Sequence, residues 1–476
     1  MTSRRDQVQA YRFLTRRIVS AMLAGEPETN ELPMRRFAFA MIGGLVVGCL
    51  VFAGFAVYGL VRPGGGKPAT KTILVERETG AKYLYIEGRL HPVLNWASAR
   101  LILGESRPAV RTMARSSLRE VPRGRPVGIP DAPDALPDKK ELVGLPWSVC
   151  SAPRSVGSLT PGSYVLIGHT PPGGSAVAAE AGLLVRAGQQ RYLLWNHHRL
   201  RVPDNATLAA LGWASVPPLP VAGALLNALP AGPDLVVPRI AGDGDPAPEE
   251  VDGEAVAIGE LFRAADQLYV MVAGGLAPVG ALASRLLTAS GRQVNEISVR
   301  EAGRLLVGAG AGAEPPGYPP AIPRLRDGEG VAAVCAAYRD PGAADAPVVV
   351  ETYARAGAEL TVPADQPPAG AGTDGVATAD RVVLPGGRAA LVRAQPVPGS
   401  AATGTVYLVT DQGLKYAIPQ QDSEKVIASL GYAGVTPVPV PTALLALVPT
   451  SVALDPRAAA LFAPPPAVVE PTRSPG

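Results

Sequence analysis

Two of the three cysteines are the side chains whose placement most clearly indicates chemistry. Cys150 ends the passage WSVC, and Cys335 ends the similar passage AAVC about 185 residues further along the chain. Thiols at equivalent positions of two duplicated halves can meet only near a two-fold axis that relates the halves. We therefore predict a Cys150–Cys335 disulfide at such an axis. Cys49 lies in an apolar run, where a thiol usually serves as a small hydrophobic side chain.

The duplication extends beyond the cysteines. Three further passages of the first half recur in the second: LHPV at 90–93 as LAPV at 276–279, ARLI at 99–102 as SRLL at 284–287, and SLRE at 117–120 as SVRE at 298–301. A nearly fixed period of this kind predicts two structurally equivalent halves.

Other chemistry is hard to find among the polar residues. The four histidines have no spacing typical of zinc ligands. The run GGGK at 64–67 resembles part of a phosphate-binding loop, but Pro68 stands where that motif needs Ser or Thr. We therefore expect no catalytic residue, no cofactor and no metal, and we interpret the glycine run as a flexible linker.

Composition excludes a second class of function. Charged residues make up 18% of the 476 residues, and the net charge is only +3. This balance is too weak for a nucleic-acid-binding surface, and aromatic residues, at 5%, are too few for base-stacking platforms. We expect no nucleic-acid partner.

An uncharged apolar run at 37–61 predicts one membrane-spanning helix. At about 1.5 Å per residue the run would reach about 37 Å, which exceeds a hydrocarbon core of about 30 Å. Arginines are concentrated in the segment before the run, and this favours a cytoplasmic amino terminus. We thus expect a single-pass protein of the inner membrane whose later residues lie outside the cytoplasm, in the periplasm, where thiols tend to oxidise.

The cytoplasmic segment 1–36 carries apolar residues at helical spacing, namely Val8, Tyr11, Leu14, Ile18 and Met22, with arginines between them. The pattern predicts an amphipathic helix. Such a helix either lies on the inner leaflet or docks on partner subunits.

The extracytoplasmic part, 62–462, contains a smaller repeat of strand, turn, strand and short helix. We place its four copies near 72–104, 182–232, 258–290 and 406–450, with Tyr83, Tyr192, Tyr269 and Tyr416 as expected core residues of the four copies. A central β domain would take 108–180 and 291–405, and a Pro-rich tail at 463–476 would be disordered. The predicted fold is α+β: one transmembrane helix, then an elongated domain of four β-rich repeat units around a central β domain with pseudo-two-fold symmetry.

Taken together, these passages resemble the EccB family, the single-span core component of the mycobacterial type VII (ESX) secretion system. The resemblance rests on QAYRFLTRR at 9–17, TGAKY at 79–83, LHPVLNWASARL at 90–101 and WSVC at 147–150. It covers nearly the whole chain, including the second cysteine segment and the proline-rich end.

The resemblance implies a structural scaffold in an inner-membrane complex that exports small helical proteins. Its implied partners are the other core components EccC, EccD and EccE, together with further copies of the chain. The cytoplasmic helix would bind neighbouring subunits through Tyr11, Arg12, Phe13, Arg16 and Arg17. Members of the family are also labelled ATPases, a role that the missing phosphate loop does not support.

Two other functions compete with the scaffold. Small repeated β-rich units often bind glycans, so a membrane-anchored peptidoglycan-binding module is one alternative. An enzyme, either an ATPase subunit of the same system or a cell-wall hydrolase, is the other. Retention of the outer domain on peptidoglycan would favour the first, and ATP turnover abolished by one point change would favour the second.

Overall fold

The computed structural model describes residues 4–24, 33–61, 67–155, 157–308, 314–342, 348–361, 377–396 and 400–463. These residues fall into two compact units. The amino-terminal unit takes Met1–Pro92 and Ala109–Gly124, and the carboxy-terminal unit takes Val93–Pro108 and Arg125–Gly476. The described residues combine helices with β-sheets, in agreement with the predicted mixture of the two. Glycines 64–66 of the predicted linker, and the predicted tail beyond Ala463, lie outside the described residues.

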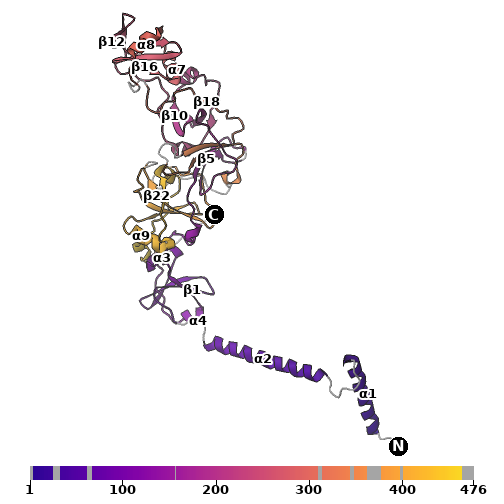
Figure 1. The fold of residues 1–476 in the computed structure, drawn as a ribbon. Helices are drawn as coiled ribbons and strands as arrows, with labels where there is room; N and C mark the ends of the chain where they lie inside the picture. The colour runs from indigo at the N-terminus through magenta and orange to yellow at the C-terminus, as the bar shows by residue number, and fades with distance from the viewer. Residues whose placement is uncertain are drawn as a thin grey trace, which may run out of the picture. The chain divides into compact units, whose positions relative to one another are not determined.

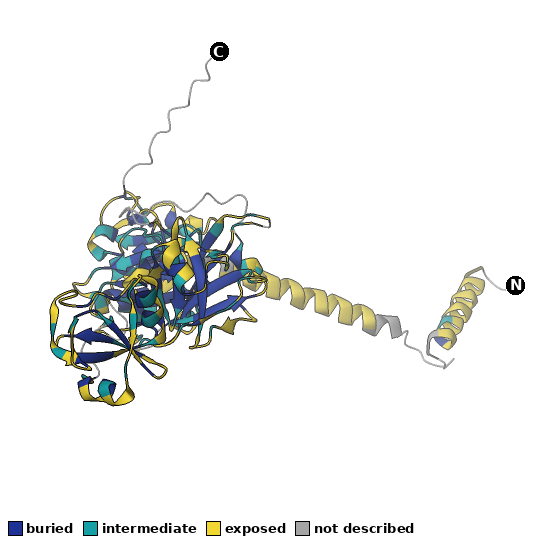
Figure 2. Cartoon of the chain, turned by 90° about the horizontal axis from the view of Figure 1, so that it is seen from above, coloured by how far each residue is buried: buried dark blue, intermediate teal, exposed yellow. Residues whose placement is uncertain are grey.

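Two helices open the chain, α1 (Arg4–Ala24) and α2 (Pro33–Val61). The part of α2 long and apolar enough to cross a membrane is Phe37–Tyr58, and its side chains are exposed along its whole length (Figure 2). α2 begins four residues before the predicted start, because a proline at the first helical position has the required φ and lacks only an N–H that would be unpaired there.

The amino-terminal unit contains the first sheet, in the order β3-β2-β1-β4. Its elements are β1 (Thr72–Glu76), β2 (Lys82–Ile86), β3 (Arg89–Pro92), β4 (Ala109–Met113) and the short helix α4 (Arg115–Leu118). β1 and β2 are joined by a turn in which Gly80 has a φ of 71°, a conformation that favours glycine. Leu74, Leu90, Met113 and Leu118 are buried together on one side of this sheet.

The carboxy-terminal unit contains three further sheets with the same order of strands. The second sheet consists of β8 (Ala181–Ala187), β9 (Gln190–Trp195), β10 (His198–Val202) and β11 (Leu219–Pro220), and β18 (Arg324–Leu325) also pairs with β8. The third sheet consists of β14 (Leu261–Ala264), β15 (Gln267–Val272), β16 (Gly275–Val279) and β17 (Val294–Glu296). The fourth sheet consists of β22 (Ala389–Gln395), β23 (Val406–Thr410), β24 (Lys415–Ile418) and β25 (Val438–Pro441). In all four sheets the first three strands are antiparallel neighbours, and the last strand pairs in parallel with the first.

The fourth sheet starts earlier than the repeat predicted at 406–450. Its first strand is β22, which lies inside the range 291–405 that we assigned to the central domain. A long connection between Gln395 and Val406 replaces the short turn that joins the same strands elsewhere, and this length hid β22 from the sequence comparison. The first and third sheets also extend past their predicted ends, since β4 and β17 complete them.

The four tyrosines predicted as core residues differ in burial. Tyr83, Tyr192 and Tyr269 lie on the second strands of their sheets and are partly buried, each packed against the edge of a hydrophobic core. Tyr416 is buried, with 1% exposure, but it lies on the third strand of its sheet. The residue on the second strand of the fourth sheet is Tyr407, which is also partly buried and pairs with Val392.

A six-stranded central sheet has the order β21-β6-β5-β19-β20-β7, and a separate hairpin consists of β12 (Pro246–Val251) and β13 (Glu254–Ala257). The central strands are β5 (Trp147–Pro153), β6 (Pro161–Ile167), β7 (Ser175–Ala176), β19 (Ala333–Tyr338), β20 (Val348–Tyr353) and β21 (Arg381–Val383). Residues far apart in sequence therefore lie on neighbouring strands, around β5 in Figure 1.

One face of the central sheet packs against the largest hydrophobic core of the described residues. Val149 and Val334 from this sheet pack with Val185 of the second sheet and Val392 of the fourth. Two short helices, α6 (Gly223–Asn227) and α10 (Thr442–Ala446), add leucines to the same core. The second and third sheets share another core, to which α5 (Asn205–Ala210) and α7 (Ala281–Ala289) contribute. The remaining helix of this region, α8 (Val299–Leu305), packs beside β16.

Within the carboxy-terminal unit, helix α3 (Trp96–Leu103) packs against the fourth sheet and its helices (Figure 1). The helices in contact with α3 are the π-helix η3 (Ala428–Tyr432), which continues α9 (Ser423–Ile427), and α11 (Pro456–Ala459). α3 begins where the Asn95 side chain accepts the Ser98 N–H, and it ends at Gly104, whose φ is 65°.

Arg100 fastens this contact. Its Nη1 donates to the Leu430 carbonyl at 2.6 Å, at the end of η3 where a helix carbonyl lacks an internal partner. The next residue, Gly431, has a φ of 98°, and a Cβ there would lie 2.4 Å from Arg100 Nη1. A side chain at 431 would therefore have two costs: the strained backbone φ, and displacement of the flexible end of Arg100 from the Leu430 carbonyl.

We predict that Gly431→Ala lowers the free energy of unfolding by about 2–4 kcal/mol, because it combines a strained φ with a displaced Arg100. Gly434→Ala is the matched control, since Gly434 has a φ of 74° but no atom within 4 Å of its added Cβ. Its loss should be limited to the backbone cost of about 1 kcal/mol. Urea unfolding of both variants measures the difference, and equal losses would contradict the clash.

Candidate functional site: the disulfide-linked strand pair and the amino-terminal helix

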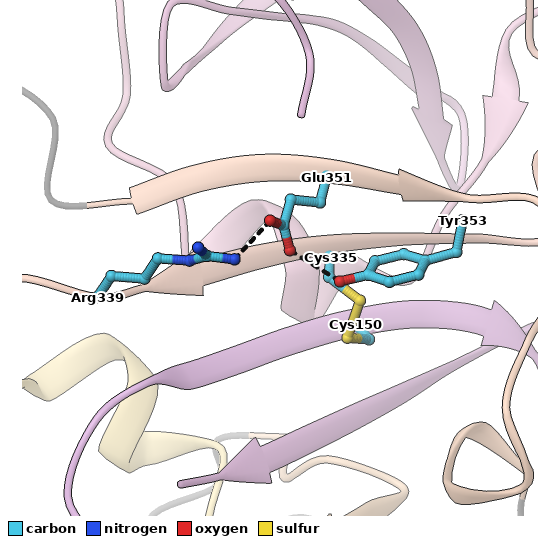
Figure 3. The surroundings of a disulfide bond; sticks show 5 residues. All are labelled: Cys150, Cys335, Arg339, Glu351 and Tyr353. Atoms are coloured by element: carbon cyan, nitrogen blue, oxygen red, sulfur yellow. Dashed lines mark hydrogen bonds and ion pairs between the residues drawn. A yellow bond between two sulfur atoms is a disulfide. The ribbon is translucent and has the colours of Figure 1, made fainter. Parts of the chain in front are cut away.

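Cys150 and Cys335 form a disulfide at the centre of the central sheet. Cys150 lies on β5, Cys335 lies directly opposite on the antiparallel strand β19, and both are fully buried (Figure 3). The bond lies on the face of the sheet turned away from the large core, among Ala152, Tyr164 and Leu166. The structure thus contains the disulfide that the duplicated passages predicted.

The pairing around this bond is regular on both sides. Val149 lies opposite Ala336, and Ser151 lies opposite Val334. Outside this pair, β6 flanks β5 and β20 flanks β19. The two edge strands are exchanged between the halves of the chain: β7 pairs with β20, and β21 pairs with β6.

A buried carboxylate lies beside the disulfide on the β19 side. Glu351, opposite Cys335 on β20, is only 8% exposed. Its two oxygens accept hydrogen bonds from Arg339 Nη2 at 2.5 Å and from the Tyr353 hydroxyl at 2.7 Å (Figure 3). Burial, followed by the bond to Glu351, raises the pKa of Tyr353 well above its ordinary value, so this hydroxyl stays protonated and donates.

A second carboxylate holds the opposite edge of the central sheet. Asp380, just before β21, accepts from Arg154, and its other oxygen accepts from the Ser163 N–H at 2.8 Å and hydroxyl at 3.0 Å. Burial alone would raise the pKa of Asp380, but these hydrogen bonds and the Arg154 charge hold it below its ordinary value. The carboxylate therefore fastens β21 to β6 in its ionised form.

Neither carboxylate is predicted from the sequence, although a signal for their arginine partners is present. Arg154 and Arg339 each follow a cysteine by the same interval, so the duplication marks them as equivalent residues. Their acidic partners are not equivalent, because Glu351 lies on β20 whereas Asp380 comes from the loop before β21. A repeat search can find only the arginines.

The predicted partner-binding residues all lie on α1, but not on one face of it. At about 100° per residue, Tyr11 shares a stripe with Val8, Leu14, Ile18 and Met22. Phe13 and the predicted arginines, Arg12, Arg16 and Arg17, lie on the other side of the helix. Tyr11 and Leu14 are 74% and 57% exposed, so the described chain leaves the apolar stripe uncovered.

Removal of the disulfide should lower the free energy of unfolding by about 2–5 kcal/mol, because the bond closes a long loop and restricts the unfolded chain. The variant is Cys150→Ala with Cys335→Ala, and denaturant unfolding is the measurement. Cys49→Ala is the control and should leave the value unchanged, since this cysteine is exposed on α2 and unbonded. A double variant as stable as the parent protein would contradict a stabilising role for the bond.

Replacement of Asp380 by Asn should lower stability by about 1–3 kcal/mol at neutral pH, because Arg154 loses its ionic partner. A carboxyl whose folded pKa is depressed stabilises the fold above its unfolded pKa of about 3.9 and loses that contribution as the pH falls through the folded pKa. The deficit of the variant should therefore shrink in acid.

Urea unfolding at several pH values between neutral and strongly acidic conditions gives this profile. Asp266→Asn, at an exposed position of the β14–β15 turn, is the matched control and should show no deficit at any pH. A deficit for Asp380→Asn that stays constant with pH would contradict an ionic origin.

Comparison with known proteins places the chain in a family. The sequence profile described as "Type VII secretion system ESX-1, transport TM domain B" matches residues 1–464. The chain is 31% identical over 465 residues to the ESX-3 secretion system ATPase EccB3 of Mycolicibacterium smegmatis, covering 93% of this chain and 87% of the relative. It is 30% identical over 481 residues to the protein of the same name from Mycobacterium tuberculosis, covering 93% and 86%.

Two solved structures are similar in fold. A chain of the EccB3 dimer from the ESX-3 core complex aligns with a TM-score of 0.64 and 27% identity, over 82% of this chain and 99% of that one. A chain of an intact ESX-5 inner membrane complex aligns with a TM-score of 0.68 and 23% identity, over 100% and 98%. The chain therefore belongs to the EccB family, whose members are components of the inner-membrane core complexes of type VII (ESX) secretion systems.

Proposed function

We propose that this chain is a structural scaffold of an ESX inner-membrane complex, built by duplication and locked across its internal two-fold axis. The observation that carries the proposal is the Cys150–Cys335 bond between directly opposed residues at the centre of the central sheet. A subunit whose two halves are joined covalently at the middle of one sheet is suited to bear load between partners, because unfolding of either half is opposed by the other.

The register around the bond supports a two-fold axis. Val149 and Val334 are equivalent in the repeated passage, and so are Ser151 and Ala336. Since Val149 pairs with Ala336 and Val334 pairs with Ser151, rotation about the disulfide converts one pairing into the other. The edge strands β7 and β21 are also exchanged between the halves, but they depart from the rotation, because β7 pairs antiparallel with β20 whereas β21 pairs parallel with β6. The four sheets that share one order of strands then become copies of one repeat unit, with the first and second in one half and the third and fourth in the other.

We further propose the topology that the arginine distribution predicts. Residues 1–36 would lie in the cytoplasm, 37–61 would cross the membrane as α2, and the sheets would lie in the periplasm, where Cys150 and Cys335 oxidise. The length and apolar composition of α2 support the crossing.

Helix α1 is the proposed attachment point for other core components and for further copies of the chain. Its apolar stripe of Tyr11, Leu14 and Ile18 is exposed, and three such side chains would bury enough surface to hold a partner helix. The basic face with Arg12, Arg16 and Arg17 would then lie toward anionic lipid headgroups of the inner leaflet. EccC, EccD and EccE are the partners that the family resemblance implies.

The names of the relatives also include the word ATPase. We do not assign that activity to this chain, because its one Gly-Lys pair, at 66–67, is followed by proline where a phosphate loop has Ser or Thr. ATP turnover by the purified full-length protein, abolished by a single substitution in that protein, would overturn this assignment.

The attachment proposal predicts that the two faces of α1 are unequal. Tyr11→Ala, Leu14→Ala and Ile18→Ala together should weaken association with the other core components at least about a hundredfold, because each side chain loses about 1.5–3 kcal/mol of burial. Co-purification of the solubilised membrane complex measures this. The matched control is Arg12→Ala, Phe13→Ala and Arg16→Ala on the opposite face, which should retain most of the complex.

Unfolding of the outer sheets should be unchanged in both triple variants, since α1 lies outside all of their cores. Full assembly with the apolar triple variant would overturn the proposed attachment. Equal loss in both variants would instead assign partner binding to the whole helix.

A further inference from the structure

The first sheet, in the amino-terminal unit, carries exposed basic side chains near the start of β1, the part that follows α2 in the chain. Lys67, Lys71, Arg89 and Arg111 are all exposed, and we call this group the basic end of the first sheet. The strand register places Lys71 and Arg89 at the same end of the sheet, on either side of β2, because Lys71 precedes β1 and Arg89 begins β3 opposite Ile86. Arg111 lies on the other edge of the sheet, two residues into β4 and opposite Leu74 of β1. Glu87 is the carboxylate in the turn before Arg89.

The covalent chain keeps this end close to α2. Six residue steps separate Val61 from Lys67, so the two can be at most about 21 Å apart, and ten steps to Lys71 allow at most about 35 Å. These limits hold for every arrangement of the sheet and the helix. Because the tether is short, the surface has a high effective concentration at the membrane. Even a weak binding site for lipid on this surface would therefore be occupied.

Strand β4 adds a second observation. Ala109, Val110, Arg111 and Thr112 are exposed at consecutive positions, although successive residues of a strand point to opposite faces. Val110 alone is 52% exposed. Both faces of this edge strand are exposed, and an apolar residue lies next to an arginine. Such a strand is suited to contact a membrane surface, where negatively charged headgroups cover an apolar interior.

We propose that the basic end of the first sheet binds the anionic phospholipid headgroups of the membrane that α2 crosses, with Val110 at the depth of the headgroups. The inference rests on the proposed membrane crossing of α2, but not on which side of the membrane the sheet occupies. Binding would fix the orientation of the first sheet relative to the bilayer. The short tether limits only the distance between the sheet and the membrane.

Fluorescence quenching in nanodiscs tests the proposal with the full chain. In a Cys49→Ala background, the remaining cysteines are buried in their disulfide, so a Thr112→Cys substitution gives a single labelling site on β4. The discs hold phosphatidylcholine alone, or phosphatidylcholine with about 30% phosphatidylglycerol, and both contain a lipid with a spin label on its headgroup. Quenching should be several-fold stronger in the anionic discs, and salt raised to about 0.5 M should remove the excess.

Two double variants separate a specific surface from net charge. Arg89→Glu with Arg111→Glu should remove the excess quenching, because each arginine near the surface contributes about five-fold in affinity. Arg77→Glu with Arg119→Glu changes the charge equally, but these exposed residues follow the far end of β1 and helix α4, so this variant should keep the excess.

Each other outcome overturns the inference in a distinguishable way. Equal quenching in neutral and anionic discs excludes a role for headgroup charge, and equal loss in both double variants reduces the effect to net charge. Shielding of the label that grows with protein concentration in neutral discs would mean that a second copy covers β4. Failure of the protein to enter discs at all would instead overturn the proposed membrane crossing.

Discussion

The fold depends on one local arrangement, the antiparallel pairing of β5 and β19 with a sulfur bridge between directly opposed residues. Every other strand of the central sheet is added outward from this pair, first β6 and β20, then β21 and β7. The large core beneath it takes valines from both central strands and from the second and fourth sheets. A shift of the pairing by one residue would turn Val149 and Val334 out of that core, so the disulfide also fixes the register on which the burial depends.

Two ion pairs add to the disulfide and the hydrophobic core in holding the central sheet together. Arg154 and Arg339 occupy equivalent places beyond the two cysteines, yet their partners, Asp380 and Glu351, come from different parts of the fold. Each pair is half covered, with the carboxylate much less exposed than the guanidinium. Such pairs contribute modestly to stability compared with the core. The Asp380 pair fastens the edge strand β21 to β6, whereas the Glu351 pair joins β20 to the end of β19.

Much of this architecture could be predicted from the sequence, because duplication leaves matched passages and a membrane helix leaves an uninterrupted apolar run. Cys150, Cys335 and most of α2 were found this way. The start of the fourth sheet was not, since the lengthened connection after β22 breaks the spacing on which a repeat search relies. Tyr416 was assigned to the wrong strand for the same reason. Glu351 and Asp380 could not be found, because their importance arises only when β20 and the loop before β21 lie beside arginines distant in sequence.

The exchange of β7 and β21 has a consequence for biogenesis. β6 is complete on its outer side only after residue 383 is available, so the first half of a nascent chain leaves an unpaired strand edge during most of its synthesis. The long sequence separation of the β5–β19 contact likewise delays closure of the central sheet. In the proposed topology, a chain emerging across the membrane would therefore remain open to chaperones until the strands of the second half had followed, and the Cys150–Cys335 bond could form only after residue 335 had crossed.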